Sequence, residues 1–383
     1  MRAKSKTTLR DEILRSLRKQ GYVVRNGRIT LPSQPTKDDL RRVNAMACEH
    51  RREEARPRLA RYESRLLRRI ACGNEVDPEA VVPTLVPVKR RTENELLFRY
   101  VCLHWSIPVS SGYGRRLRFL VEDQSNGKLI GLFGLGDPVY SLRARDQWIG
   151  WDADTKKDRL YHVMDAFVLG AVPPYSRLLC GKLVALLAMT DTVRKAFRER
   201  YGTRKTLISG EVHKPYLALI TTASALGRSS LYNRIKINGF EYWQRVGATA
   251  GWGEFHFSNG VYSDIRAYAE RWCKPTAKRE PWGSGFRNRR EVIRKVLSRI
   301  GLSTDLANHG IQREVYAAPL GQESLAFLRG EVQRPLFFNL TQNDLWEAFR
   351  DRWFLARARR CLQYRDFDRE SYRLWPAEQM GAE

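Results

Sequence analysis

The central structural unit of this chain is predicted by residues 161–202, YHVMDAFVLGAVPPYSRLLCGKLVALLAMTDTVRKAFRERYG. Its apolar run from Val163 to Val172 predicts a buried strand, which a turn at 170–176 interrupts. Leucines then recur at helical spacing, which predicts a helix that begins near Ser176. A strand, a turn and a helix in this order can direct the first N–H groups of the helix toward an anion. The stretch therefore predicts a core strand–helix unit with a candidate anion site at its turn.

The segments on both sides of this unit predict the remainder of a sheet. Residues 117–123 (LRFLVED) and 128–136 (KLIGLFGLG) alternate as strands do, and Asn126–Gly127 is a strong hairpin signal between them. Glycines in the second run indicate a tightly packed or bulged strand. A helix is predicted for 224–236, and further strands are predicted for 146–152 (DQWIGWD), 206–212, 240–246 and 313–320.

The order of these elements predicts an α+β fold with a central mixed, GNAT-like β-sheet and flanking helices. The GNAT-like character is a likeness of fold, and a fold carries no function by itself. Residues 1–77 are predicted to form a basic helical N-terminal extension, 78–330 an α/β core domain and 331–383 a C-terminal helical tail. Within that tail, the aromatic residues of 341–360 are expected to pack in the core.

The charge of the chain points to a polyanionic partner. The 383 residues carry a formal net charge of +26 and have a pI near 10.1, while 43% of them are hydrophobic. This apolar content is sufficient for a globular core. Lys and Arg gain affinity for nucleic acid by releasing its condensed counterions, so nucleic acid, DNA above all, is the first partner to consider.

Cysteine spacing and hydropathy argue against a metal-binding, a secreted or a membrane-spanning protein. The six cysteines lie far apart without a C-x-x-C pair, so we predict no metal site and no cofactor. Neither a signal-peptide core nor an apolar run of about 18 residues occurs. The sequence therefore predicts a protein that is cytoplasmic and not membrane-bound.

Arginines and aromatic residues cluster after Gly112–Tyr113–Gly114. Arginine can grip phosphate with two hydrogen bonds, and aromatic planes can stack bases. Because a strand alternates its side chains, Arg116 and Arg118 are expected to share a face that Arg115 does not. A structural cluster of tryptophans beneath a charged strand is the alternative. The predicted nucleic-acid contacts are Arg115, Arg116, Arg118, Arg145, Trp151, Arg177 and Lys182.

The turn of the opening stretch does not carry a complete phosphate-binding motif. A P-loop requires G-x-x-x-x-G-K-[ST], but position 176 is Ser and position 183 is Leu. The turn also lacks the full Gly-x-Gly of the GNAT pyrophosphate loop. Ser176, Arg177 and Lys182 therefore remain candidates for an anion without a specific motif.

Carboxylates offer a second hypothesis. Metal-dependent chemistry on DNA requires acidic side chains that hold a divalent ion, and Asp146 and Glu211 are the candidate catalytic residues. Glu211 is placed on a predicted buried strand. The alternative is that both carboxylates are buried ion-pair partners of arginines.

Several long segments together resemble the DruA family, which is named after the Druantia anti-phage defence systems. They are residues 105–123 (WSIPVSSGYGRRLRFLVED), 128–140 (KLIGLFGLGDPVY), 144–152 (ARDQWIGWD), 163–189 and 313–320 (REVYAAPL). The resemblance covers roughly residues 1–330. It implies a role in bacterial defence alongside other Druantia proteins, including a large helicase-like component. Shorter relatives carry Glu-Thr-Phe-Val where this chain has 211–214, which weakens any catalytic role carried over to Glu211.

We therefore expect an anti-phage component that binds DNA or another nucleic acid through arginine-rich faces. The alternatives are a metal-dependent enzyme acting on DNA through Asp146 and Glu211, and a scaffold whose basic faces bind acidic partner proteins.

Overall fold

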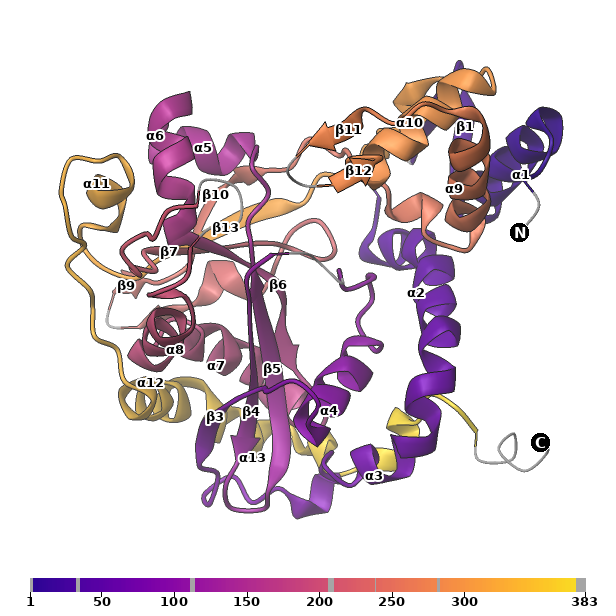
Figure 1. The fold of residues 1–383 in the computed structure, drawn as a ribbon. Coiled ribbons are helices and arrows are strands. Elements are labelled where there is room, and N and C mark those ends of the chain that lie inside the picture. Colours follow the sequence, from indigo (N-terminus) through magenta and orange to yellow (C-terminus); the bar gives the residue numbers. More distant parts are fainter. Residues whose placement is uncertain are drawn as a thin grey trace.

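The computed structural model describes residues 3–31, 35–110, 114–205, 210–237, 239–280 and 283–376. Its centre is a seven-stranded sheet in the order β10-β13-β7-β6-β5-β4-β3 (Figure 1). All neighbours are antiparallel except β6 and β7, so the sheet is mixed. The α+β class and the central mixed sheet with flanking helices are confirmed. The strands are β3 (Pro83–Pro87), β4 (Arg116–Asp123), β5 (Lys128–Gly136), β6 (Val163–Ala171), β7 (Leu219–Ala223), β10 (Gln244–Ala248) and β13 (Glu314–Pro319).

The opening stretch forms the centre of the sheet and its main covering helix. After β6 the chain makes a short 3-10 helix (Tyr175–Leu178) and then α7 (Cys180–Leu187) and α8 (Asp191–Tyr201). The α-helix thus begins four residues later than the sequence predicts, because Leu179 takes a left-handed conformation (φ 64°) between the two helices. α7 is buried almost completely against β5 and β6, so it organises the largest hydrophobic cluster.

The glycines of β5 allow an aromatic ring to lie on the sheet. The pairing register between β5 and β6 shifts between Gly134 and Leu135, as expected for a bulged strand. A Cβ at Gly134 would lie 2.3 Å from Cζ of Phe167, whereas one at Gly136 would come no closer than 3.3 Å to the same ring. The ring of Phe167 therefore occupies the space that a side chain at Gly134 would need.

Gly134→Ala is expected to lower the free energy of unfolding by about 1–3 kcal/mol, the usual cost of overpacking. Gly136→Ala, facing the same ring at a longer distance, is the matched control and should cost clearly less. Urea denaturation of both variants measures the difference. Equal stability of the two variants would contradict the placement of Phe167.

A second hydrophobic cluster joins the N-terminal segment to residues much later in the chain. α1 (Lys6–Lys19), the hairpin of β1 (Val23–Arg25) and β2 (Arg28–Thr30), and the start of α2 (Lys37–Leu59) pack with α9 (Val261–Trp272) and α10 (Arg289–Arg299). Figure 1 shows these elements as a lobe from which α2 runs back toward the sheet. α2 therefore connects this lobe to the central domain.

Two predicted elements differ from the structure. Residues 143–149 form a helix, α5 (Arg143–Ile149), which Gly150 ends with φ 85°, so the apparent alternation of 146–152 is that of a short helix with Ile149 in the core. Residues 224–236 form no α-helix; they contain a short 3-10 helix (Tyr232–Arg234) and the first residue of a short strand. The Ser224 hydroxyl donates to the Gly227 carbonyl and closes a turn at the start of this segment. The predicted strand 206–212 lies largely outside the described residues.

Several further elements are short. They are α6 (Ala153–Arg159), α11 (Ser324–Leu328), β8 (Lys236–Ile237), β9 (Phe240–Glu241), β11 (Ala277–Glu280) and β12 (Gly283–Gly285). Across the described residues, no helix has both the length and the apolar character needed to cross a membrane.

The C-terminal segment packs on both faces of the central domain. α12 (Gln342–Phe349), a π-helical turn and α13 (Leu355–Arg360) bury Trp346, Phe349 and Phe354 in the cluster around α7, which confirms the predicted core role of the aromatic stripe. Residues 367–375 then cross to the opposite cluster, where they pack on α3 (Glu63–Leu67) and α4 (Glu93–Cys102).

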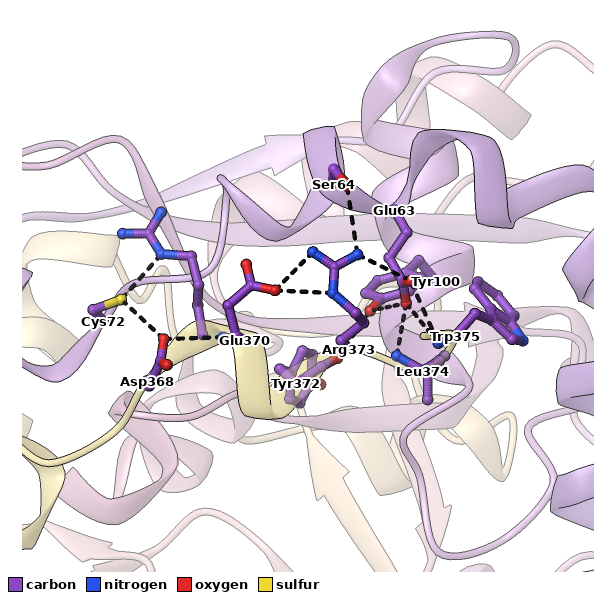
Figure 2. Close-up of polar contacts among 11 residues, drawn as sticks. Glu63, Ser64, Cys72, Tyr100, Asp368, Glu370, Tyr372, Arg373, Leu374 and Trp375 are labelled. Carbon is purple, nitrogen blue, oxygen red and sulfur yellow. Dashed lines mark hydrogen bonds and ion pairs between the residues drawn. The ribbon is translucent and has the colours of Figure 1, made fainter. Parts of the chain in front are cut away.

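A buried carboxylate holds this last segment (Figure 2). Glu63 is only 2% exposed, and its Oε1 accepts from the Tyr100 hydroxyl at 2.8 Å and from the Leu374 amide at 2.7 Å. The Trp375 amide and the Arg373 guanidinium complete its environment. Burial, followed by the charge of Glu63, raises the pKa of Tyr100 far above its usual range. The carboxylate thus links α3, α4 and residues 373–375.

Candidate nucleic-acid interface

A cavity of about 450 Å³ lies between α2, α4, the loop 103–110 and the strands β4 and β6. Arginine is the most frequent charged residue in its wall, and only two glutamates, Glu54 and Glu95, oppose it. Aromatic side chains form much of the remaining wall. The arginines are Arg51, Arg58, Arg99, Arg116 and Arg118, and the aromatic residues are Phe98, Trp105 and Phe167.

Strand β4 places Arg116 and Arg118 in this cavity. Leu117, Phe119 and Val121 alternate with them and face the opposite cluster around α7. The prediction that Arg116 and Arg118 share a face is therefore confirmed, and this face contacts α4.

The guanidinium of Arg116 lies 4.9 Å above the ring of Phe167. It has neither a hydrogen bond nor an ion pair to any residue that the structure describes. Burial lowers the pKa of Arg116, and the neighbouring charge of Arg118 lowers it further. A cation in this state is destabilised by lost hydration and by repulsion, so an anion placed beside it is favoured.

Arg118 is partly neutralised. Its Nη1 lies 2.9 Å from Oε1 of Glu95, and its guanidinium lies 5.7 Å from the ring of Phe98. The second oxygen of Glu95 accepts from the amide of Arg91. Both α4 and β4 are thus fixed around this pair.

Helix α2 holds the loop that forms the roof of the cavity. The Arg51 guanidinium donates to the Val109 carbonyl at 2.5 Å, the Arg52 Nε donates to the Leu103 carbonyl at 3.2 Å, and the Cys48 thiol donates to the Trp105 carbonyl at 3.6 Å. Three contacts from consecutive turns of one helix therefore position Trp105. The sequence analysis did not assign this role to α2, although it predicted a basic helical segment there.

The basic surface continues from the cavity to α10. Arg51 and Glu54 of α2 are among the charges that act on Arg289, whose pKa burial lowers. The Arg289 guanidinium lies 3.7 Å from the ring of Tyr262 and donates to the Phe257 carbonyl. The arginine-rich segments near residues 51 and 289, far apart in sequence, are therefore neighbours in the fold.

Arg115 and Arg145, predicted to bind nucleic acid, are held inside the protein. Arg115 Nε lies 2.6 Å from Oδ1 of Asp137, and its Nη1 donates to the Tyr161 carbonyl. Arg145 is completely buried, and its guanidinium donates to Asp146 and to two backbone carbonyls. Neither lines the cavity, because each guanidinium is directed to an internal acceptor.

Trp151, Arg177 and Lys182 likewise make internal contacts. Trp151 Nε1 donates to the Leu328 carbonyl, and Arg177 Nη1 donates to the Gln363 carbonyl. Lys182 Nζ donates to the Arg234 carbonyl and lies 4.8 Å from the ring of Trp353. Burial, with repulsion from Arg234 and Arg352, lowers the pKa of Lys182 to about 8. The structure thus brings only Arg116 and Arg118 of the seven predicted contacts into one cavity.

The two candidate catalytic carboxylates differ in their surroundings. Asp146 Oδ1 lies 2.6 Å from Arg145, while its Oδ2 lies 3.3 Å from Lys156 and accepts from the Leu142 amide. This arrangement favours the ion-pair interpretation of Asp146. Glu211 is exposed and lies outside any named strand, next to the isolated bridge between Lys205 and Val212. In the described ranges, no group of three or more His, Cys, Asp or Glu residues is arranged to hold a metal ion.

Comparison with known proteins identifies the family. The family model of Druantia protein DruA matches residues 34–330, which include every residue of the cavity wall. Druantia protein DruA of Escherichia coli (strain UMEA 4076-1) is 39% identical over 331 residues, which cover 86% of this chain and 82% of that protein. No solved structure matches significantly. The chain therefore belongs to the DruA family, whose namesake is a component of Druantia anti-phage defence.

Proposed function

We propose that this DruA family member is the nucleic-acid-binding component of a Druantia defence complex and that its ligand is DNA. The observation that carries the proposal is the cavity with five arginines in its wall, of which Arg58, Arg99 and Arg116 form no ion pair within the described residues. Unpaired guanidiniums beside aromatic planes suit a phosphate backbone with exposed bases.

The electrostatics of the whole chain support the same partner. A net charge of +26 produces a strong field at the protein surface, which attracts polyanions and accelerates their association. The neighbouring positions of Arg51 and Arg289 extend the basic surface beyond the cavity. A strand entering the cavity would thus meet further cations along its backbone.

The proposal includes the cellular compartment and the partner proteins. We place the protein in the cytoplasm, where it would act with other Druantia proteins, among them a large helicase-like component. A scaffold that binds acidic proteins is the remaining alternative, and co-purification that survives nuclease treatment would favour it.

The affinity for single-stranded DNA is expected to fall steeply with salt. If about three to five phosphates of a single strand are neutralised, the slope of log K against log salt is about −2 to −3.5, so affinity falls about 20- to 100-fold between about 50 and 200 mM salt. Fluorescence anisotropy of a labelled oligonucleotide measures the slope. An affinity that does not change with salt, or no binding at low salt, would refute the proposal.

A matched pair of variants locates the interface. Arg99→Gln removes an exposed arginine at the cavity and should reduce the slope by about one. Arg359→Gln removes an arginine that is 74% exposed on α13, outside the cavity wall, and should leave the slope unchanged.

A further inference from the structure

We infer that the cavity binds one unpaired nucleotide, with its phosphate at Arg116 and its base beside Trp105. The inference rests on the proposed function and deepens it by naming what enters the cavity. A nucleotide combines an anion with a flat apolar group, and the cavity wall offers a partner for each.

Size excludes a duplex from the cavity. A volume of about 450 Å³ lies within the range of sites that hold one small ligand, about 300–1,000 Å³. One turn of duplex DNA is about 34 Å long. A nucleotide must therefore enter alone, either from a single strand or extruded from a helix, as enzymes that act on bases require.

The anion position is defined by Arg116. Its guanidinium is partly desolvated and has no anionic partner among the described residues, whereas Arg118 beside it is bound to Glu95. A phosphate would supply the missing charge for Arg116. It would also relieve the repulsion between the two guanidiniums.

The base position is defined by Trp105. Its indole packs beside Gly170, where a Cβ would lie 3.1 Å from Cζ2. Its ring makes no ring–ring or cation–π contact within the described ranges, unlike Phe98 and Phe167, which each have a guanidinium over the ring. The contact between Cys48 and the Trp105 carbonyl fixes the backbone at this residue. A half-buried ring that is held in the cavity wall and makes no other ring contact is suited to stack a base.

The same chemistry occurs in a strand and in a free mononucleotide, so the test compares both. The probes are a paired duplex, the same duplex with one extruded 2-aminopurine, a single strand that carries 2-aminopurine, and free dAMP. We expect the two unpaired probes to bind at least tenfold more tightly than the paired duplex. Their 2-aminopurine emission should be quenched by stacking on Trp105.

Two tryptophan variants assign the quenching. Trp105→Leu should abolish it and reduce the preference for unpaired DNA to less than threefold, while the salt slope stays unchanged. Trp272→Leu, on α9 and 46% exposed, is the control and should keep both. Quenching of the wild-type complex decides the question even where Trp105→Leu folds poorly.

Each outcome has a distinct meaning. Displacement of the quenched strand by dAMP at low concentration supports the nucleotide site and assigns it to a free nucleotide. Equal affinity for all DNA probes without quenching overturns the inference and leaves the proposed function standing. No salt-dependent binding of any probe overturns both.

Discussion

Glu63→Ala is expected to lower the free energy of unfolding by about 3–5 kcal/mol. Glu63 is buried, and its loss leaves the amides of Leu374 and Trp375 without the acceptor they have in the structure. Tyr100 keeps its bond to the Tyr372 carbonyl, and Arg373 keeps its ion pair with Glu370. Breaking a buried ion pair from one side has a cost of this size, because the remaining polar groups stay desolvated. Urea denaturation measures the loss, and limited proteolysis should show early cleavage of residues 367–376.

Glu49→Gln is the matched control for this prediction. Glu49 lies on α2, 63% exposed, and forms only a surface ion pair with Arg52. Such pairs contribute about 0–1 kcal/mol, so this variant should unfold close to the wild-type midpoint. A loss below about 1 kcal/mol for Glu63→Ala would show that the carboxylate does not hold the C-terminal segment.

Arg116→Met is expected to weaken DNA binding at least tenfold and at the same time to stabilise the protein by about 0.5–1 kcal/mol. The opposite signs arise because Arg116 is a partly buried cation with no anionic partner among the residues that the structure describes, whereas methionine fills similar space without a charge. Fluorescence anisotropy measures the affinity, and thermal unfolding measures the stability. Gain of stability with loss of function is typical of residues retained for a ligand.

Arg118→Met provides the contrast. It breaks the pair with Glu95, so both affinity and stability should fall. A decrease in stability for Arg116→Met as large as that for Arg118→Met would contradict the description of Arg116 as uncompensated.

Local pattern predicted the sheet well where neighbouring residues decide the structure. The alternation of 116–121, the hairpin at Asn126–Gly127 and the strand at 313–320 all reappear, because the period of a strand is a local property. The same alternation correctly predicted that Arg116 and Arg118 lie on one face of the strand and Arg115 does not. The prediction was wrong for a short element whose structure depends on a single turn. Residues 146–152 alternate like a strand, but they belong to a short helix that ends at Gly150.

The local sequence pattern did not predict which lysine and arginine side chains would be buried. Lysine and arginine are usually exposed, so Arg145 and Lys182 were expected to meet a ligand. Arg145 is instead held by acceptors close to it in sequence, the carbonyls of Val139 and Tyr140 and the side chain of Asp146. Lys182 is held by the carbonyl of Arg234, in a later segment of the chain. The cavity likewise combines residues near 51, 99, 116 and 167, and only the tertiary fold brings them together.

The contact between Glu63 and residues 374–375 also concerns the order of synthesis. A ribosome produces α2, α4 and β4 early, but the segment that ties α3 to α4 emerges after more than two hundred and fifty further residues. The tie between α3 and α4 is therefore completed only after every strand of the central sheet has been synthesised.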